Sequence, residues 1–77
     1  MNITFENIQN MFNAINRNDI NENSRNLVDD DIIDSIDMMK LILEIEKFIG
    51  KNLDAKYITP DNFEDFSTIK KMLEDAI

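Results

Sequence analysis

The sequence predicts a small all-α domain, and its composition and hydrophobic spacing support this class. The chain has 77 residues, 43% of them hydrophobic, with one Gly and one Pro. An all-β fold needs many more turn residues, and a disordered chain has fewer apolar ones. The apolar residues also recur every three or four positions, which is the spacing of amphipathic helices. We therefore expect one domain over residues 1–77, with three main helices and one short helix.

Residues 4–16 form the first expected helix. Its apolar side chains fall within an arc of about 120° on a helical wheel. They are Phe5, Ile8, Met11, Phe12 and Ile15. Thr4 can cap the start of this helix, and the Asn- and Asp-rich residues 16–19 should end it, because their side chains compete for backbone hydrogen bonds.

Residues 17–33 have no sustained period and are rich in Asn, Asp and Ser. We expect a long surface loop held to the core by Ile20, Leu27 and Val28. Ordered loops of more than about 12 residues are often functional.

The second helix, residues 35–49, has the clearest ends. Asp34 is a favourable N-cap, and Asp37 stands three residues later in the position of a capping box. Gly50, the single glycine, suits a left-handed C-terminal cap.

Two further helices are expected near the C-terminus. Thr59 and Pro60 favour the start of a short helix over residues 60–65. Ser67 can cap a last helix over residues 68–76. The expected core combines the apolar faces of the helices with one linker residue: Phe5, Ile8, Phe12, Ile15, Met38, Ile42, Ile45, Ile49, Leu53, Ile69, Met72 and Leu73.

Charge and composition exclude several classes of function. Sixteen acidic and eight basic residues give a net charge of −8, which disfavours nucleic acid as a partner and favours basic protein surfaces. The chain has no Cys and no His, so disulfides, zinc sites and Ser-His-Asp catalysis are excluded. We find no signal peptide or membrane-spanning stretch, and expect a cytoplasmic monomer that is not an enzyme and does not insert into membranes.

The second helix carries a second apolar stripe on the side away from its core face. Ile36, Met39 and Leu43 lie at about 100°, 40° and 80° when Ser35 is set at 0°. Two interpretations stay open. Either neighbouring helices bury both sides of a central helix, or the stripe is exposed and docks on another protein.

Five Asp and no basic residue occur between positions 29 and 37. An EF-hand counted from Asp29 would place Asp34 and Lys40 where Gly and Glu are needed, so that motif is excluded. The simpler interpretation of the first three Asp is a solvated loop.

Ser35 stands between Asp34 and Asp37 at the start of a helix, where free N–H groups and the helix dipole favour a phosphate group. It is either an additional cap or the acceptor of a phosphoryl-linked group from another enzyme. Without a neighbouring base it is a poor nucleophile for chemistry of its own. Asp34 and Asp37 as an acid–base pair are disfavoured, because an exposed helix start does not separate their pKa values.

These residues carry a resemblance to a known family. The stretch from Ile33 to Lys47 resembles the Asp-Ser-Leu-Asp signature of acyl carrier proteins and the recognition helix that follows it. Most of the chain fits the pattern, with a first helix, a long loop, a serine at the second helix, the pair Ile49-Gly50 and residues 58–63 before a final helix. The resemblance implies an all-α four-helix bundle of the acyl-carrier type.

The resemblance also implies a function. Ser35 would carry covalent 4'-phosphopantetheine, transferred from coenzyme A by a phosphopantetheinyl transferase, and acyl or aminoacyl groups would be held on the arm as thioesters. Asp34 would help the transferase to handle magnesium-coenzyme A. Ile36, Asp37, Met39 and Leu43 would face the partner enzymes, which load and process the cargo.

The chain differs from the family at several positions. Ile32 and Ile33 stand where many relatives have Gly, and an aromatic residue usually found just before the helix-ending Gly is displaced to Phe48. Lys40 and Lys47 occupy positions that are commonly acidic, which indicates a different choice of partner. The alternative function is an unmodified acidic docking module that uses the stripe of Ile36, Met39 and Leu43.

Overall fold

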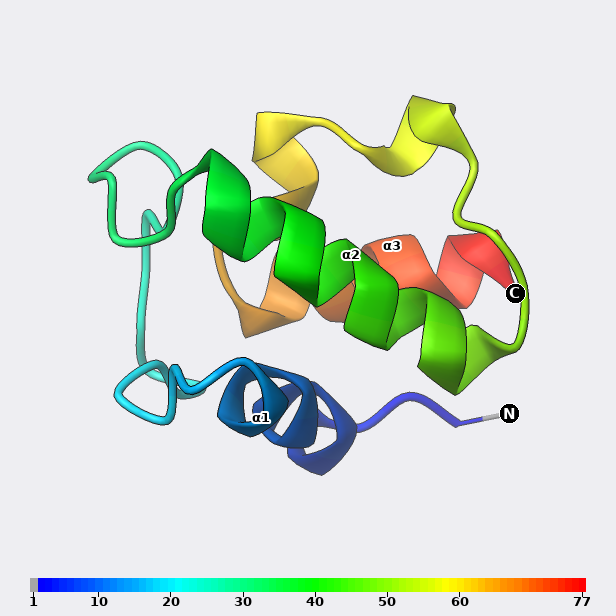
Figure 1. The fold of residues 1–77 in the computed structure, drawn as a ribbon, viewed down its shortest axis with the longest axis horizontal. Coiled ribbons are helices and arrows are strands. Elements are labelled where there is room, and N and C mark those ends of the chain that lie inside the picture. The colour runs from blue at the N-terminus through cyan, green and yellow to red at the C-terminus, as the bar shows by residue number, and fades with distance from the viewer. Residues whose placement is uncertain (1) are drawn as a thin grey trace.

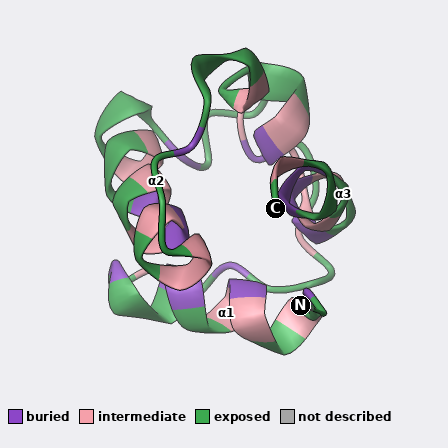
Figure 2. Ribbon diagram, turned by 90° about the vertical axis from the view of Figure 1, so that its right-hand side faces the viewer, coloured by how far each residue is buried: buried purple, intermediate pink, exposed green. Residues whose placement is uncertain are grey.

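The computed structural model describes residues 2–77, and all of its regular structure is helical (Figure 1). The elements in chain order are α1 (Phe5–Ala14), α2 (Ser35–Ile49), the 3-10 turns η1 (Ala55–Tyr57) and η2 (Pro60–Phe63), and α3 (Phe66–Ala76). Helix α1 packs against both α2 and α3, and η2 packs against α3. The buried positions face the space enclosed by the three helices (Figure 2). The predicted all-α class is confirmed.

The predicted short helix over residues 60–65 is instead a single 3-10 turn. Thr59 makes no side-chain capping bond at its start. Asp65 is extended, with φ −160° and ψ 177°, because it serves as the N-cap of α3. Too few residues then remain between Pro60 and Asp65 for a turn of α-helix to propagate. Residues 2–77 thus hold three α-helices, and a full four-helix bundle is not shown.

Local capping explains the ends of α1 and α2. The Thr4 hydroxyl accepts a hydrogen bond from the Asn7 N–H at 3.1 Å. Asn16 follows the end of α1 with φ 63°, a left-handed conformation that Asn tolerates. Helix α2 has the predicted bounds and ends at Gly50, whose φ of 74° suits a residue without a Cβ.

The predicted start of the last helix is wrong. Asp65, and not Ser67, is the N-cap, and its carboxylate accepts from the Thr68 N–H at 2.8 Å. The helix therefore begins at Phe66. The Phe66 ring is stacked on Phe12 at a centroid distance of 5.5 Å and meets Phe5 edge-on at 5.7 Å. This buried aromatic cluster fixes the first turn of α3 against α1.

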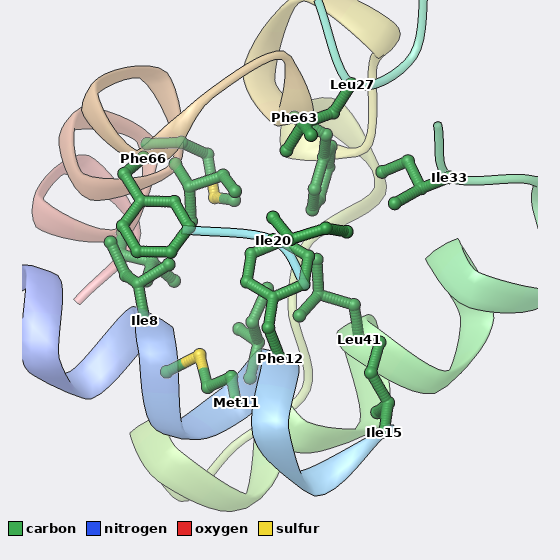
Figure 3. Packing of buried hydrophobic residues seen from close by; sticks show 14 of the residues in the cluster. Ile8, Met11, Phe12, Ile15, Ile20, Leu27, Ile33, Leu41, Phe63 and Phe66 are labelled. Atoms are coloured by element: carbon green, nitrogen blue, oxygen red, sulfur yellow. The ribbon is translucent and has the colours of Figure 1, made fainter. Parts of the chain in front are cut away.

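The core is larger than predicted and more dependent on the loops (Figure 3). Four predicted core residues are only partly buried: Phe5, Met38, Ile42 and Ile49. The other eight are buried as predicted. Eight more buried residues were not in the predicted core: Ile3, Met11, Ile20, Leu27, Ile33, Leu41, Phe63 and Phe66. On α2 the deepest side chains are Leu41 and Ile45, so the core face is rotated away from Ile42.

The long loop between α1 and α2 is tightly attached to the rest of the fold. Ile20 and Leu27 are buried as expected, Val28 is half-buried, and Ile33 adds a further anchor. The Leu27 N–H donates to the Glu64 carbonyl at 2.9 Å, and the Val28 N–H donates to the Glu64 carboxylate at 2.9 Å. These bonds hold the loop against the segment before α3 and so set the approach of the chain to α2.

Candidate functional site

The candidate site is the N-terminal end of α2, where a reciprocal capping box orients the chain. The Asp34 carboxylate accepts from the Asp37 N–H at 2.8 Å, and the Asp37 carboxylate accepts from the Asp34 N–H at 3.2 Å. Two of the backbone donors at this end are thereby satisfied. Ser35 is the first residue of the helix and is exposed. Ser35 therefore lies at the surface of the molecule.

The electrostatics of this end keep Asp34 ionised. The hydrogen bond from the Asp37 N–H lowers the pKa of the Asp34 carboxyl below its ordinary value, and the Ile36 N–H and the Arg17 charge act in the same direction. A carboxyl group with a lowered pKa is a poor general acid near neutral pH. It is better suited to attract a cation or a basic partner.

Arg17 joins the loop to the start of α2. Its Nη1 lies 2.7 Å from the Asp37 carboxylate, while its Nε lies 3.1 Å from Asp19. Both side chains of the Arg17–Asp37 pair are largely buried, with 23% and 18% exposed. The hydrogen bonds that Arg17 donates to the Asp19 carboxylate are the main cause of its raised pKa. No local sequence signal predicts this pairing, because the two partners are twenty positions apart.

The second apolar stripe is exposed. Ile36, Met39 and Leu43 have 61%, 66% and 59% of their surface exposed, more than any other large hydrophobic residue that the structure describes. Leu41 and Ile45, on the other side of α2, are almost fully buried. Burial of both sides of α2 was therefore the wrong interpretation. The stripe begins directly beside Ser35, so Ser35 and the apolar anchors are parts of one surface.

The acidic loop before the site is solvated. Asp29, Asp30 and Asp31 are exposed. Hydrogen bonding to the Glu64 carboxyl group and repulsion by its charge raise the pKa of Asp29. Among residues 2–77 there is no group of three or more acidic side chains with the geometry to hold a metal ion.

The N-terminal end of α2 has two features that bear on its chemistry. Ser35 offers an exposed hydroxyl at a helix N-terminus, where a phosphate is electrostatically favoured. In the described part of the chain, no histidine, cysteine or lysine stands at positions 34–39 to act as a base. A separate enzyme would have to supply the base and the donor.

Residues 2–77 contain no helix that is both long and apolar enough to cross a membrane. Comparison of the chain with models of known protein families, with curated proteins and with solved structures gives no match.

Proposed function

We propose that this chain is an acyl carrier protein, in which Ser35 carries 4'-phosphopantetheine. The observation that supports this most is the position of Ser35, exposed at the first residue of α2 and directly followed by an exposed apolar stripe. Such a surface combines an attachment point with a docking face. The proposal also agrees with the resemblance of residues 33–47 to the carrier signature.

The modification is a transfer to the serine oxygen. The Ser35 Oγ forms a bond to the phosphorus of coenzyme A that bears the pantetheine, and the phosphoanhydride bond to the second phosphate breaks. Adenosine 3',5'-bisphosphate leaves, and the hydroxyl proton passes to a base of the transferase. The attached arm supplies the thiol on which acyl or aminoacyl thioesters are held, which this cysteine-free chain lacks.

The residues around Ser35 have separate roles in this proposal. The capping box holds the Ser35 backbone in a rigid first turn, which positions the hydroxyl for the transferase. Asp34 stays ionised and faces the magnesium and coenzyme A of the transferase complex. Ile36, Met39 and Leu43 would insert into apolar pockets of the transferase and of the enzymes that load and process the cargo.

Intact mass spectrometry tests the attachment point. After incubation with a broad-specificity phosphopantetheinyl transferase, coenzyme A and Mg²⁺, the wild type should gain one phosphopantetheine and Ser35→Ala none. Ser67→Ala is a matched control, because Ser67 is also exposed in the first turn of a helix capped by Asp. Absence of modification in a folded wild type, or its persistence in Ser35→Ala, would refute the proposal.

Asp34→Asn tests the role of the charge. Asn preserves the N-cap but removes the negative charge, so modification should slow while helix α2 stays intact. Asp65→Asn makes the same change at the start of α3 and should leave the rate unchanged.

The alternative function is an unmodified acidic docking module. The exposed stripe of Ile36, Met39 and Leu43 supports it, because an apolar row on a charged helix suits a groove on another protein. The mass experiment separates the two functions, since the docking module remains unmodified.

A further inference from the structure

A groove beside the C-terminal half of α2 has a formal charge opposite in sign to that of the whole chain. It has a volume of about 620 Å³ and lies between the end of α1 and the C-terminal half of α2. Lys40, Lys47 and Lys51 line it, together with Glu44, Glu46 and the exposed Leu43. Half of the six lysines in the sequence thus border one groove, whose formal charge is +1 in a chain of −8.

The glutamates of the groove are engaged, whereas most of the lysine charge is available. Glu44 pairs with Lys47 at 3.0 Å, and the Glu46 carboxylate accepts from the Leu53 N–H at 2.8 Å. Lys40 and Lys51 are exposed and form no ion pair within residues 2–77, and the Lys47 side chain is 74% exposed. A partner therefore meets ammonium groups around an apolar anchor.

Helix α2 consequently has two ends of opposite character. The approach to its N-terminus carries Asp29, Asp30, Asp31 and Asp34, whereas Lys40 and Lys47 lie further along the helix and Lys51 follows its C-terminal cap. Lys40 and Lys47 are separated by seven residues, about 10 Å along the helix. The apolar stripe runs from the acidic end into the groove and ends at Leu43.

We propose that this groove docks the acidic end of an amphipathic helix of a partner protein. An apolar side chain of that helix would cover Leu43, and carboxylates about two turns apart would face Lys40 and Lys47. Basic groups further along the partner surface would face the acidic end of α2. A partner with basic groups alone would suit only half of this surface, because charge complementarity governs both register and specificity. The inference goes beyond the proposed function, since docking at the groove does not require modification of Ser35.

A synthetic peptide tests this on the unmodified chain. The probe is a helical peptide with leucines on one face, lysines at one end and glutamates at the other. Amide shifts in a ¹⁵N-labelled protein should map its glutamate end to Leu43, Lys47 and Lys51. Reversal of the three groove lysines, Lys40→Glu, Lys47→Glu and Lys51→Glu together, should weaken binding roughly tenfold or more. A second peptide, with its glutamates replaced by lysine, should bind this triple variant more tightly than it binds the wild type.

The chain provides a matched control. Reversal of the other three lysines, Lys56, Lys70 and Lys71, gives the same net charge on other elements and should not weaken binding of the mixed peptide. A triple glutamine variant of the groove lysines tests neutralisation if the reversed chain fails to fold.

Three results would overturn the inference. They are binding of the mixed peptide that is unchanged by the groove variants, equal weakening by the control variant, and self-association of the free chain through the groove, which would make a second copy the occupant. None of these results depends on whether Ser35 is modified, so this proposal and the carrier function can fail separately.

Discussion

The starts of α2 and α3 use the same local chemistry for different purposes. Each begins at an Asp N-cap with a reciprocal capping box, and each has a serine in its first turn. At α3 the first helical residue is Phe66, which is buried between Phe5 and Phe12. At α2 the first helical residue is Ser35, and the apolar residue beside it is the exposed Ile36.

This difference separates buried from exposed apolar residues. A capping box orients a helix start, but it does not determine which way the apolar residue of the first turn points. At α3 that residue joins the core, and at α2 it is left to solvent. An exposed Ile at a well-ordered helix start therefore contributes little to folding, whereas the buried Phe66 contributes much.

Substitution of Phe66 and Ile36 should show the difference between the two helix starts most clearly. Phe66→Ala removes two aromatic contacts and leaves a cavity, and should cost about 3 to 5 kcal/mol. A domain of this size has a total stability of roughly 4 to 12 kcal/mol, so much of it would be lost. Ile36→Ala should change stability by no more than about 0.5 kcal/mol. Urea denaturation followed by circular dichroism measures both, and a comparable loss for Ile36→Ala would place it in the core.

The sequence predicted those parts of the fold that depend on local signals. The bounds of α2 follow from Asp34, Asp37 and Gly50, whose effects act within one turn of the helix. The start of α3 was missed because Asp65 and Ser67 are both acceptable caps. Only the burial of Phe66 against α1 decides between them, and that contact joins residues more than fifty positions apart.

The candidate site could likewise be predicted only where its residues depend on local signals. Ser35, Asp34 and the stripe were recognisable from spacing on one helix. Arg17, Glu64 and Lys51 were not, since their roles come from the folding of the loop and the linker onto α2 and α3. The core residues Ile33 and Phe63 show the same limit. They lie in segments without a helical period, so periodicity gives no indication that they are buried.

The two faces of α2 provide a second pair of substitutions. Ile45→Ala removes a fully buried side chain and should cost about 2 to 5 kcal/mol. Leu43→Ala removes an exposed one and should leave the thermal melt nearly unchanged, while weakening transferase binding by about 1 to 2 kcal/mol if Leu43 is a hot spot. Thermal melts and modification kinetics on the same preparations measure the two effects. An equal loss of stability in both variants would mean that the stripe is part of the core.

Salt should act mainly on the acidic end. The net charge of −8 and the five Asp at positions 29–37 repel one another at low ionic strength. Screening should raise the melting temperature by about 2 to 8 °C between low and moderate NaCl, equivalent to on the order of 0.5 to 1 kcal/mol. The rise should be smaller when Asp29, Asp30 and Asp31 are replaced together by Asn. A melting temperature that is independent of salt in the wild type would contradict the repulsion.

The smallest expected effect is a pH dependence of stability, to which Asp34 and Asp29 contribute with opposite signs. The pKa of Asp34 is lowered in the folded chain, mainly by the Asp37 N–H. The stabilisation from ionised Asp34 is therefore present above its unfolded pKa and is lost as the pH falls through its folded pKa. The pKa of Asp29 is raised by Glu64, so the fold is favoured while Asp29 is protonated, and this contribution is lost as the pH rises through its folded pKa.

Single Asn substitutions separate the two contributions. Asp34→Asn keeps a capping side chain but should flatten the loss of stability on acidification. Asp29→Asn removes the repulsion with Glu64, so it should raise stability near neutral pH and have no such benefit in acid, where Asp29 is already protonated. Urea midpoints measured from about pH 2.5 to 7 cover both transitions, because unperturbed Asp titrates near 3.9. If Asp29→Asn stabilised the chain equally at both pH limits, the gain would not come from the carboxylate pair. The attachment of the loop to Glu64 would then rest on the backbone N–H bonds from Leu27, Val28 and Asp29.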